Sequence, residues 1–312
     1  MRPRPILAMM AVLVATAPLM AQGRPYRGDD FDSDQQSKLD TTLTLNPSGT
    51  VDLSLVSGEI KVTSWDRNQV RIVATTEQGV LNIDGSPSRV ALTVRGEGRH
   101  NNVGDATFQV TVPSSARLLM RTVSGEITSR GGAEVEAHTV SGDLSVSDVK
   151  GRATLETVSG ELTGTGIGGN TRANSVSGDV TLHGVTGDVD AETVSGDIEL
   201  TDARSSSVRM SSTSGDAHYQ GTVDPKGRYD FHSYSGDVRL ALPASTSAQL
   251  SVETFSGDLD SDFPMTLLPG AQRSSGHPKR MEFRIGNGGA IISATTFSGD
   301  VTIERGSGRS ED

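Results

Sequence analysis

The sequence has no cysteine and few aromatic residues, with one tryptophan, four tyrosines and seven phenylalanines among 312 residues. The absence of cysteine excludes disulfide bonds and the lipidated cysteine that anchors bacterial lipoproteins. Because aromatic side chains are scarce, any core must be built from valine, leucine, isoleucine, alanine and threonine. Side chains of this size pack well in regular layers, so the composition favours a repetitive fold.

Basic residues are also in deficit, because 28 lysines and arginines face 39 aspartates and glutamates, for a net charge of −11. A surface this acidic repels phosphate backbones, so nucleic acid is not predicted as a partner. No apolar run after residue 21 is long enough to cross a bilayer, and we predict no membrane span in the mature chain. Glycine, in contrast, is abundant, with 36 copies.

Residues 1–21 carry the features of a secretory signal peptide. Arg2 and Arg4 precede an apolar run that starts at Ile6, and a small residue, Ala21, stands at a plausible cleavage point. A retained membrane anchor is the alternative, but Pro18 breaks the run, which is shorter than the roughly 20 residues of a span. We therefore predict export to the periplasm, the cell surface or the exterior. A polar linker is predicted at 22–38 and a polar tail at 306–312.

Most of the chain repeats one short motif, Ser-Gly followed by Asp or Glu. From the second copy onward the motif glycines are 17 to 21 residues apart, except for one interval of 42 before the last copy. A fixed period of about 20 residues is typical of a solenoid, in which each repeat forms one turn. The glycines predicted to form corners of the solenoid are Gly125, Gly142, Gly160, Gly178, Gly196, Gly215, Gly236, Gly257 and Gly299.

Alignment on this glycine predicts two short strands and two corners in each turn, stacked in parallel. The residues seven and five before the glycine and two after it are mostly apolar, and those between are polar, as in half-buried strands. The residue two before the glycine is also apolar, valine in early turns and Tyr234, Phe255 or Phe297 in later ones. We predict that this column faces inward through a break in alternation at the corner, and that Tyr229 and Phe231 widen the core with it.

The predicted fold class is therefore all-β, a parallel β-solenoid with about 18–21 residues per turn. Residues 39–112 are less regular and are predicted to form an N-terminal β cap with the first rung. A cap of this kind protects the open end of a solenoid. Residues 113–305 are predicted to form the solenoid repeats, with a loop insertion at 263–280 in place of the missing motif.

Three segments resemble a known family: Thr-Val-Ser-Gly-Glu-Ile at 122–127, Thr-Val-Ser-Gly-Asp-Ile at 193–198 and Thr-Phe-Ser-Gly-Asp-Val at 296–301. They are similar to a family of bacterial envelope proteins with repeated β strands, labelled "putative adhesin" and classed as a domain of unknown function. The resemblance covers about residues 40 to 305. It implies the β-repeat fold and a role in surface binding, and it brings no catalytic residues with it.

The residue after each motif glycine is acidic, and stacked turns would align these carboxylates. One hypothesis is a row of weak Ca²⁺ sites, because hard cations bind several oxygen ligands. We favour the alternative that aspartate suits a tight corner, where its side chain bonds backbone amides. An unchanged melting temperature in millimolar Ca²⁺ against chelator would exclude the calcium sites. Their candidate ligands are Asp143, Asp179, Asp197, Asp216, Asp237 and Asp258.

Hydroxyl residues flank the apolar corner column, as in the pairs Thr139/Ser141 and Thr193/Ser195. Two outward columns of hydroxyls would order water, as on ice-binding solenoids. Alternation argues against this arrangement, because at least one column is expected to face inward or to cap the corner backbone.

A polysaccharide lyase or hydrolase is the alternative function, because parallel β-helices also carry such enzymes. These enzymes need paired carboxylates in a groove, often lined with aromatic side chains. Here the acids are spread evenly along the repeats, and Trp65 is the only tryptophan. We predict that the protein is not an enzyme and uses no cofactor.

Positive charge gathers in the predicted insertion at Arg273, Lys279 and Arg280. Loops on rigid scaffolds often carry binding sites, although a charged loop also prevents solenoids from stacking end to end. The predicted function is a non-catalytic exported module of the envelope or cell surface. Its predicted partner is a cell-wall or surface glycan or an envelope protein, and a purely structural role is the second possibility.

Overall fold

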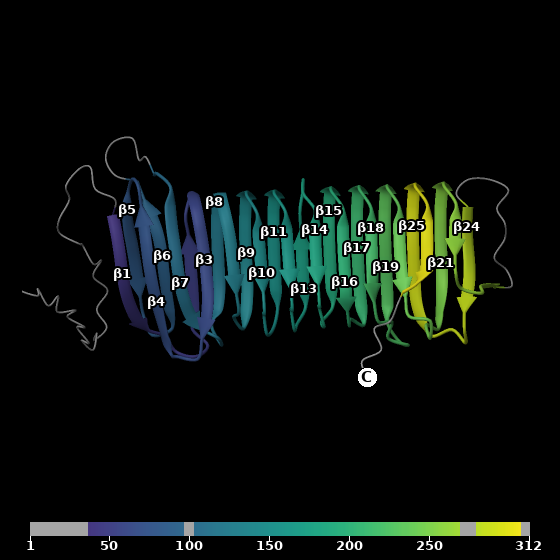
Figure 1. Cartoon of the computed structure of the whole chain (residues 1–312), viewed down its shortest axis with the longest axis horizontal. Coiled ribbons are helices and arrows are strands. Elements are labelled where there is room, and N and C mark those ends of the chain that lie inside the picture. The colour runs from purple at the N-terminus through teal and green to yellow at the C-terminus, as the bar shows by residue number, and fades with distance from the viewer. Residues whose placement is uncertain (1–36, 97–102, 269–278, 307–312) are drawn as a thin grey trace, which may run out of the picture.

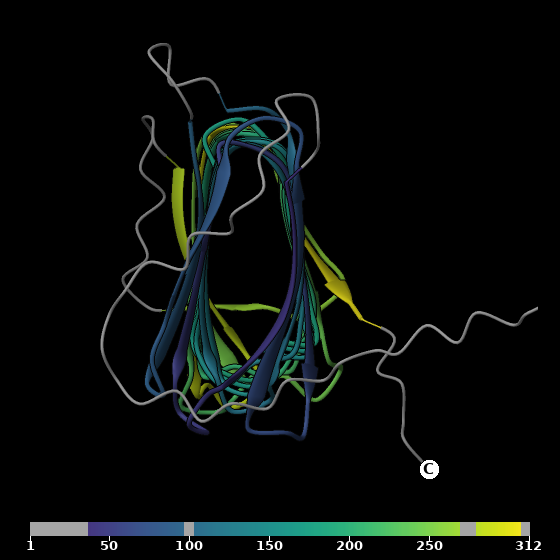
Figure 2. The same cartoon turned by 90° about the vertical axis from the view of Figure 1, so that its left-hand side faces the viewer.

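A computed structural model describes residues 37–96, 103–268 and 279–306 of the chain, which form a long rod of stacked β strands (Figure 1). Viewed along the rod, two walls of strands face each other and are joined by corners (Figure 2). The all-β parallel solenoid predicted from the repeat is confirmed. The predicted signal peptide and nearly all of the linker and tail lie outside the described residues. No described segment forms a helix long and apolar enough to cross a membrane.

The middle of the rod is a regular stack in which each turn gives one strand to each wall. Leu144 pairs with Ile127 of the turn before and with Leu162 of the turn after, so identical motif positions lie side by side. The strands are β9 (Glu134–Ser141), β10 (Leu144–Ser147), β11 (Ala153–Ser159), β12 (Leu162–Thr165), β13 (Thr171–Asn174), β14 (Val180–His183), β15 (Val189–Ser195), β16 (Ile198–Ala203), β17 (Ser207–Ser214), β18 (Ala217–Gly221), β19 (Arg228–Ser235) and β20 (Val238–Leu242).

At the N-terminal end the strands do not stack in the order of the sequence. The turn made by β2 and β3 lies between β8 and the turn made by β6 and β7. Antiparallel pairing of β1 with β4 and of β5 with β6 closes this end. The strands are β1 (Ser37–Thr44), β2 (Thr50–Ser54), β3 (Ser57–Trp65), β4 (Gln69–Thr76), β5 (Val80–Gly85), β6 (Arg89–Arg95), β7 (Ala106–Pro113) and β8 (Arg117–Arg130).

The C-terminal end shows the same kind of inversion. The last turn of the sequence, β25 and β26, lies between the β19–β20 turn and the β21–β22 turn. Strand β24 then runs antiparallel along the outer side of β21 (Figure 1). The strands are β21 (Ala248–Ser256), β22 (Leu259–Ser261), β23 (Thr266–Leu267), β24 (Lys279–Ile285), β25 (Ala290–Ser298) and β26 (Val301–Arg305).

These C-terminal strands differ from the expected loop insertion at 263–280 in a sequential stack. Strand β23 and the start of β24 fall within those residues, and the chain reverses direction there. The 42-residue interval therefore does not contain an ordinary turn that lost its motif. It contains a reversal that brings β25 into register with both β19 and β21.

The core between the walls changes in width along the rod. In the 18-residue turns it is narrow and is filled by alanines such as Ala173 and Ala191, with aliphatic neighbours. Farther along, Tyr219, Tyr229 and Phe231 are buried, and the ring centroids of Tyr219 and Phe231 lie 5.2 Å apart. Longer turns therefore enclose larger side chains, as predicted for Tyr229 and Phe231.

Candidate functional site

The corner formed by the Ser-Gly-Asp motif, here called the motif corner, requires glycine for two reasons. Gly178 and Gly196 have φ values of 154° and 145°, a region that residues with a side chain rarely adopt. A Cβ atom on either glycine would also collide with the carbonyl oxygen of the motif glycine in the preceding turn. Stacking of successive glycines thus lets the backbones of adjacent turns approach closely.

The hydroxyl residue three before each motif glycine points inward, and in several turns it caps this corner. The hydroxyl groups of Thr193, Ser212 and Ser233 donate to the carbonyl oxygens of Gly178, Gly196 and Gly215, at 3.2, 3.1 and 2.9 Å. Alternation therefore continues through this residue, because residues seven, five and three before the glycine all face the core. One hydroxyl column does face inward and cap the corner, as the sequence indicated.

The apolar residue two before the motif glycine faces outward, and the prediction that it faces inward was wrong. Between 37% and 51% of each of these side chains is exposed. The corner backbone turns immediately after the inward hydroxyl residue, so the next side chain projects to solvent. These residues form the motif-corner stripe, which in spatial order consists of Val56, Val123, Val140, Val158, Val176, Val194, Tyr234, Phe297 and Phe255. The polar Thr213 takes this position in the turn of β17, between Val194 and Tyr234.

The stripe ends in a stack of aromatic rings. The rings of Tyr234 and Phe297 are parallel within 2° at a centroid distance of 4.8 Å, and those of Phe297 and Phe255 within 8° at 4.6 Å. The inserted β25 places Phe297 between the other two rings. The three aromatic residues that the sequence assigned to a widened core therefore belong to the surface.

The acidic residue after each motif glycine also has a local role. Asp179 Oδ1 accepts a hydrogen bond from the amide of Asp197 at 2.9 Å, and Asp197 Oδ1 accepts one from the amide of Asp216 at 2.7 Å. The same bond links Asp216 to Asp237, Asp237 to Asp300 and Asp300 to Asp258. Each of these aspartates except Asp258 therefore satisfies a corner amide of the neighbouring turn.

These hydrogen bonds bear on the calcium hypothesis. Within the described residues no group of three or more His, Asp or Glu side chains is arranged to hold a metal ion. The candidate ligands Asp143, Asp179, Asp197, Asp216, Asp237 and Asp258 stand one per turn, and the first five each offer one oxygen to a neighbouring amide. Only Asp258, the last of them, acts solely as the amide donor in this series.

Along four consecutive turns this acidic row has no basic partner among the residues that the structure describes. Across the described parts of the chain, no ion pair involves Asp143, Glu161, Asp179 or Asp197, whereas Arg239 pairs with both Asp216 and Asp237 in later turns. Asp143, Asp179 and Asp197 each accept a hydrogen bond from the backbone amide of the neighbouring turn. The Glu161 carboxylate accepts a hydrogen bond only from the Thr163 hydroxyl. Negative charge, rather than the amide bond, is what these four positions share.

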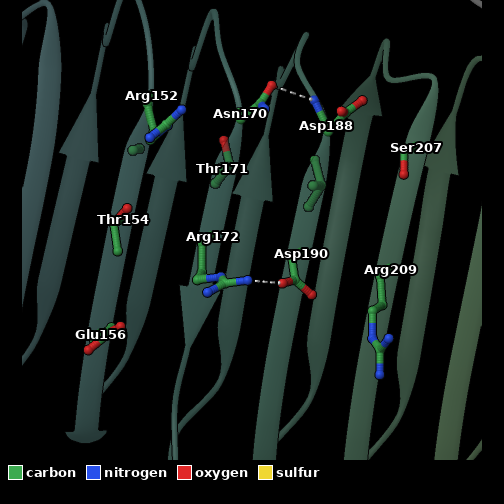
Figure 3. Close-up of a pocket in the computed structure, with 12 residues that line it drawn as sticks. Arg152, Thr154, Glu156, Asn170, Thr171, Arg172, Asp188, Asp190, Ser207 and Arg209 are labelled. Carbon is green, nitrogen blue, oxygen red and sulfur yellow. Dashed lines mark hydrogen bonds and ion pairs between the residues drawn. The ribbon is translucent and has the colours of Figure 1, made fainter.

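A second surface feature lies on the flank of the wall that contains β11, β13, β15 and β17. It is a shallow hollow of about 520 Å³ that spans these four neighbouring strands (Figure 3). We call it the flank hollow. Its floor is backbone around the buried Ala153, Thr171 and Val189. Its polar lining consists of Arg152, Thr154, Glu156, Asn170, Arg172, Asp188, Asp190, Ser207 and Arg209.

Some polar groups of the flank hollow have partners among the described residues, and others have none. Arg172 and Asp190 form an ion pair at 2.9 Å, and the side-chain oxygen of Asn170 accepts a bond from the Asp188 amide at 3.4 Å (Figure 3). Asp190 Oδ1 has no hydrogen-bond partner. Among the interactions of the described residues, none involves the Arg152 guanidinium. Hydrogen-bonding groups are therefore still available in the hollow.

A smaller hollow of about 290 Å³ adjoins the flank hollow through Glu156. His138 there contacts Glu156 at 3.0 Å and Glu136 at 3.2 Å. Burial acts to raise the pKa of the Glu136 carboxyl, but hydrogen bonds from His138 and Arg117 outweigh it, so this pKa lies below its usual value. These side chains are engaged with one another.

Two of the three predicted basic residues, Lys279 and Arg280, are described and lie at the start of β24. Arg273 lies outside the described residues, and Lys279 begins β24. Arg280 follows it in the strand and approaches Glu282 at 3.5 Å. The sequence missed the flank hollow because its residues come from four turns. The signal that was available is the recurrence of arginine at neighbouring outward positions, as in Arg172 and Arg209.

Comparison with known proteins gives one family match and several structural likenesses. The model of the family described as Toastrack DUF4097 matches residues 41–304. None of the curated proteins compared with the chain matches it.

The structural likenesses are remote. A protein described as a putative adhesin from Parabacteroides distasonis is 10% identical, with a TM-score of 0.45 over 87% of this chain and 98% of that one. A putative adhesin from Bacteroides fragilis is 10% identical, with a TM-score of 0.38 over 86% and 98%. A putative lipid binding protein from Parabacteroides distasonis is 10% identical, with a TM-score of 0.38 over 85% and 96%. At these values the likenesses carry no argument about function.

Proposed function

The chain belongs to the Toastrack DUF4097 family, and from that premise we propose that it is a non-catalytic exported module that binds an envelope protein along its motif corner. The observation that carries the proposal is the motif-corner stripe. Single exposed valines are ordinary on protein surfaces, but contiguous apolar surface marks interaction sites. Here the valines repeat at the same corner in successive turns.

The acidic row beside the stripe determines the chemistry of the partner. Asp143, Glu161, Asp179 and Asp197 stand three residues after Val140, Val158, Val176 and Val194, in four turns where no ion pair with them is found within the described ranges. Like charges on adjacent strands repel each other, at a spacing of about 4.8 Å. A partner that brings basic side chains relieves this repulsion, whereas an anionic polymer increases it.

The spacing of the turns suits an amphipathic helix. The valines repeat about every 4.8 Å along the rod, and a helix repeats about every 5.4 Å along its axis. Over four turns of the solenoid the accumulated offset between the two repeats is only about 2 Å. Flexible lysine or arginine side chains bridge an offset of this size. A helix with an apolar row beside a basic row therefore matches the valine and acidic rows of this surface.

Export of the module is supported by the sequence alone. Arg2, Arg4 and the apolar run from Ile6 are typical of a secretory signal peptide, and the absence of cysteine is compatible with folding without disulfide bonds. The partner is then a segment of another protein of the envelope or the cell surface. The repeated corner serves as a long contact surface with no catalytic step.

A synthetic helix tests the partner chemistry directly. The probe is an 18-residue peptide with leucines on one face and lysines beside them, compared with the same peptide carrying glutamates in place of lysines. We expect the full chain to bind the lysine peptide at least 10-fold more tightly than the glutamate peptide. Binding should weaken as salt rises, because the charge contribution is screened. Fluorescence anisotropy at low and high salt gives both quantities.

Two sets of variants separate the rows of the surface. The variant Val140→Ser/Val158→Ser/Val176→Ser removes apolar side chains, and Asp143→Asn/Asp179→Asn/Asp197→Asn removes charge while keeping an oxygen that accepts the amide bond. Each should weaken the lysine peptide at least fivefold. The controls are Ile291→Ser, an equally exposed aliphatic residue off the stripe, and Asp260→Asn, an exposed acid off the row.

Two results would overturn the proposal. Equal binding of the lysine and glutamate peptides would show that the acidic row does not select the partner. Unchanged binding in the serine variant would show that the valines take no part, so that only general charge attraction remained.

A further inference from the structure

We infer that the flank hollow is a binding site for a short neutral oligosaccharide. The hollow lies on a wall of the solenoid rather than on the motif corner, so this inference does not rest on the proposed docking of an envelope protein. Its volume of about 520 Å³ falls within the range of small-molecule sites, and its four strands span roughly 14 Å. That length accommodates two or three sugar units.

The lining is electrically balanced although the whole chain is acidic. Arg152, Arg172 and Arg209 contribute positive charge, and Glu156, Asp188 and Asp190 contribute negative charge. A balanced lining gives no net attraction to an anion or a cation. The chain's overall charge of −11 further disfavours an anionic ligand. A neutral ligand is therefore the class that the electrostatics favour.

The chemistry of the lining suits hydroxyl groups. A sugar hydroxyl donates one hydrogen bond and accepts others, so it fits a surface where donors and acceptors alternate within a few ångströms. Arginine and asparagine supply donors here, and glutamate and aspartate supply acceptors, on adjacent strands (Figure 3). Hydrogen bonds to charged groups of this kind are stronger than those between neutral groups.

Part of the hydrogen-bonding capacity is not used within the protein. The guanidinium of Arg152 has no interaction with any described residue. Asp190 Oδ1 is a buried acceptor that has no hydrogen bond, while Arg172 holds the other oxygen. The Asn170 oxygen is turned to the Asp188 amide, which leaves its amino group as a donor. Arg152 and Arg209 lie at opposite ends of the hollow and would contact the two ends of the ligand (Figure 3).

The experiment compares neutral and acidic trisaccharides on the full chain. Chitotriose and maltotriose are the neutral probes, and trigalacturonate is the acidic one, with affinity measured by calorimetry and contact by saturation-transfer NMR. We expect at least one neutral probe to bind, and trigalacturonate to bind at least fivefold more weakly than that probe. The variant Arg152→Ala/Arg209→Ala should weaken the neutral probe at least fivefold.

A matched control distinguishes the hollow from arginine content in general. Arg130→Ala removes an equally exposed arginine that approaches only Asp148, at 3.7 Å on another part of the rod, and should leave binding unchanged. The double variant should fold, because among the described residues Arg152 has no partner and Arg209 approaches only Glu192, at 3.7 Å, and the melting temperature verifies this. The inference is overturned if no neutral probe binds below about 10 mM. It is also overturned if the double variant binds like the wild type, or if trigalacturonate binds more tightly.

Discussion

Two stretches of the rod use the same corner around different cores. From β9 to β16 the turns are 18 residues long, the core contains alanines, and the motif-corner stripe is valine. From β17 onward the turns lengthen and the core contains Tyr219, Tyr229 and Phe231, and from β19 onward the stripe is aromatic. Glycine nevertheless stacks on glycine in both stretches.

The stacking at the motif corner and the width of the core therefore vary independently along the rod. The additional residues of the longer turns fall at the opposite corner, where Tyr229 Oη donates to the Ser205 carbonyl and accepts from the Asp224 amide, both at 2.8 Å. The motif therefore fixes how adjacent turns approach each other, and the opposite corner adjusts the width. Variants that affect one part should leave the other unchanged.

The largest expected effect is on the shared corner. Gly196→Ala and Gly236→Ala should each cost about 2–6 kcal/mol, because an alanine here has an unfavourable φ and its Cβ collides with the neighbouring carbonyl. Gly184→Ala is the control, since its Cβ would lie 3.7 Å from the nearest atom and only its φ of 67° is unfavourable. It should cost about 1 kcal/mol in urea unfolding. Equal costs for all three would contradict a packing requirement at the motif corner.

The second-largest effect should be the difference in stability loss between core substitutions in the wide and the narrow stretch. Phe231→Ala removes a buried ring from the wide stretch and should cost about 3–5 kcal/mol, whereas Ala191→Gly in the narrow stretch should cost about 1 kcal/mol. Thermal unfolding followed by circular dichroism measures both. A small loss for Phe231→Ala would mean that the wide turns collapse onto the space left by the ring.

A smaller effect should appear within a single column. Thr193 donates to the Gly178 carbonyl, but the Thr157 hydroxyl, at the same position of another turn, is buried with no hydrogen-bond partner. Thr193→Val should therefore cost about 1 kcal/mol. Thr157→Val should be neutral or stabilising, because it removes a buried polar group that has no partner. Equal costs in urea titrations would contradict a role for the corner hydrogen bond.

The smallest expected effect is a pH dependence of stability that arises in the wide core and is absent at neutral pH. Burial raises the pKa of Tyr219 above its ordinary value of 10.0, so the folded chain keeps this proton after the unfolded chain has lost it. Stability should therefore fall as pH rises above about 10. The fall should be shallower in Tyr219→Phe, which has no proton to lose. Unfolding free energies at several pH values from 8 to 11 measure the two slopes, and identical slopes would contradict this assignment.

Much of the architecture could be predicted because the repeat is so regular. The period gave one turn per motif, and the apolar positions seven and five before the glycine identified the inner face. The error at Val140 and its equivalents has a physical cause. Apolarity alone suggested burial, but the inward position belongs to Thr139, whose hydroxyl bonds a corner carbonyl at 3.4 Å. Continued alternation from Ala137 to Thr139 was the better guide.

Two features could not be predicted from one sequence. The order of turns at each end leaves no trace in the period, because Gly299 has the same motif whether its turn lies last or next to last. The flank hollow is equally hidden, because Arg152 and Arg209 are far apart in sequence and line one surface only through parallel stacking. The repeated motif segments did indicate the resemblance to the family, which the match over residues 41–304 confirms.

The inversion at the C-terminal end has a consequence for truncation and for the order in which the rod is completed. The turn of β21 and β22 precedes β25 and β26 in the sequence, yet its neighbours in the rod are β24 and those two later strands. The amide of Gly236 likewise donates to the Ser298 carbonyl, at 3.1 Å, from the last turn of the sequence. A chain that ended before Ala290 would therefore lack the turn of β25 and β26, and the turn of β21 and β22 would lose the strands with which it pairs. Loss of its last segment would leave the edge of β19 open, so an incomplete molecule carries an unpaired strand edge that a complete molecule does not.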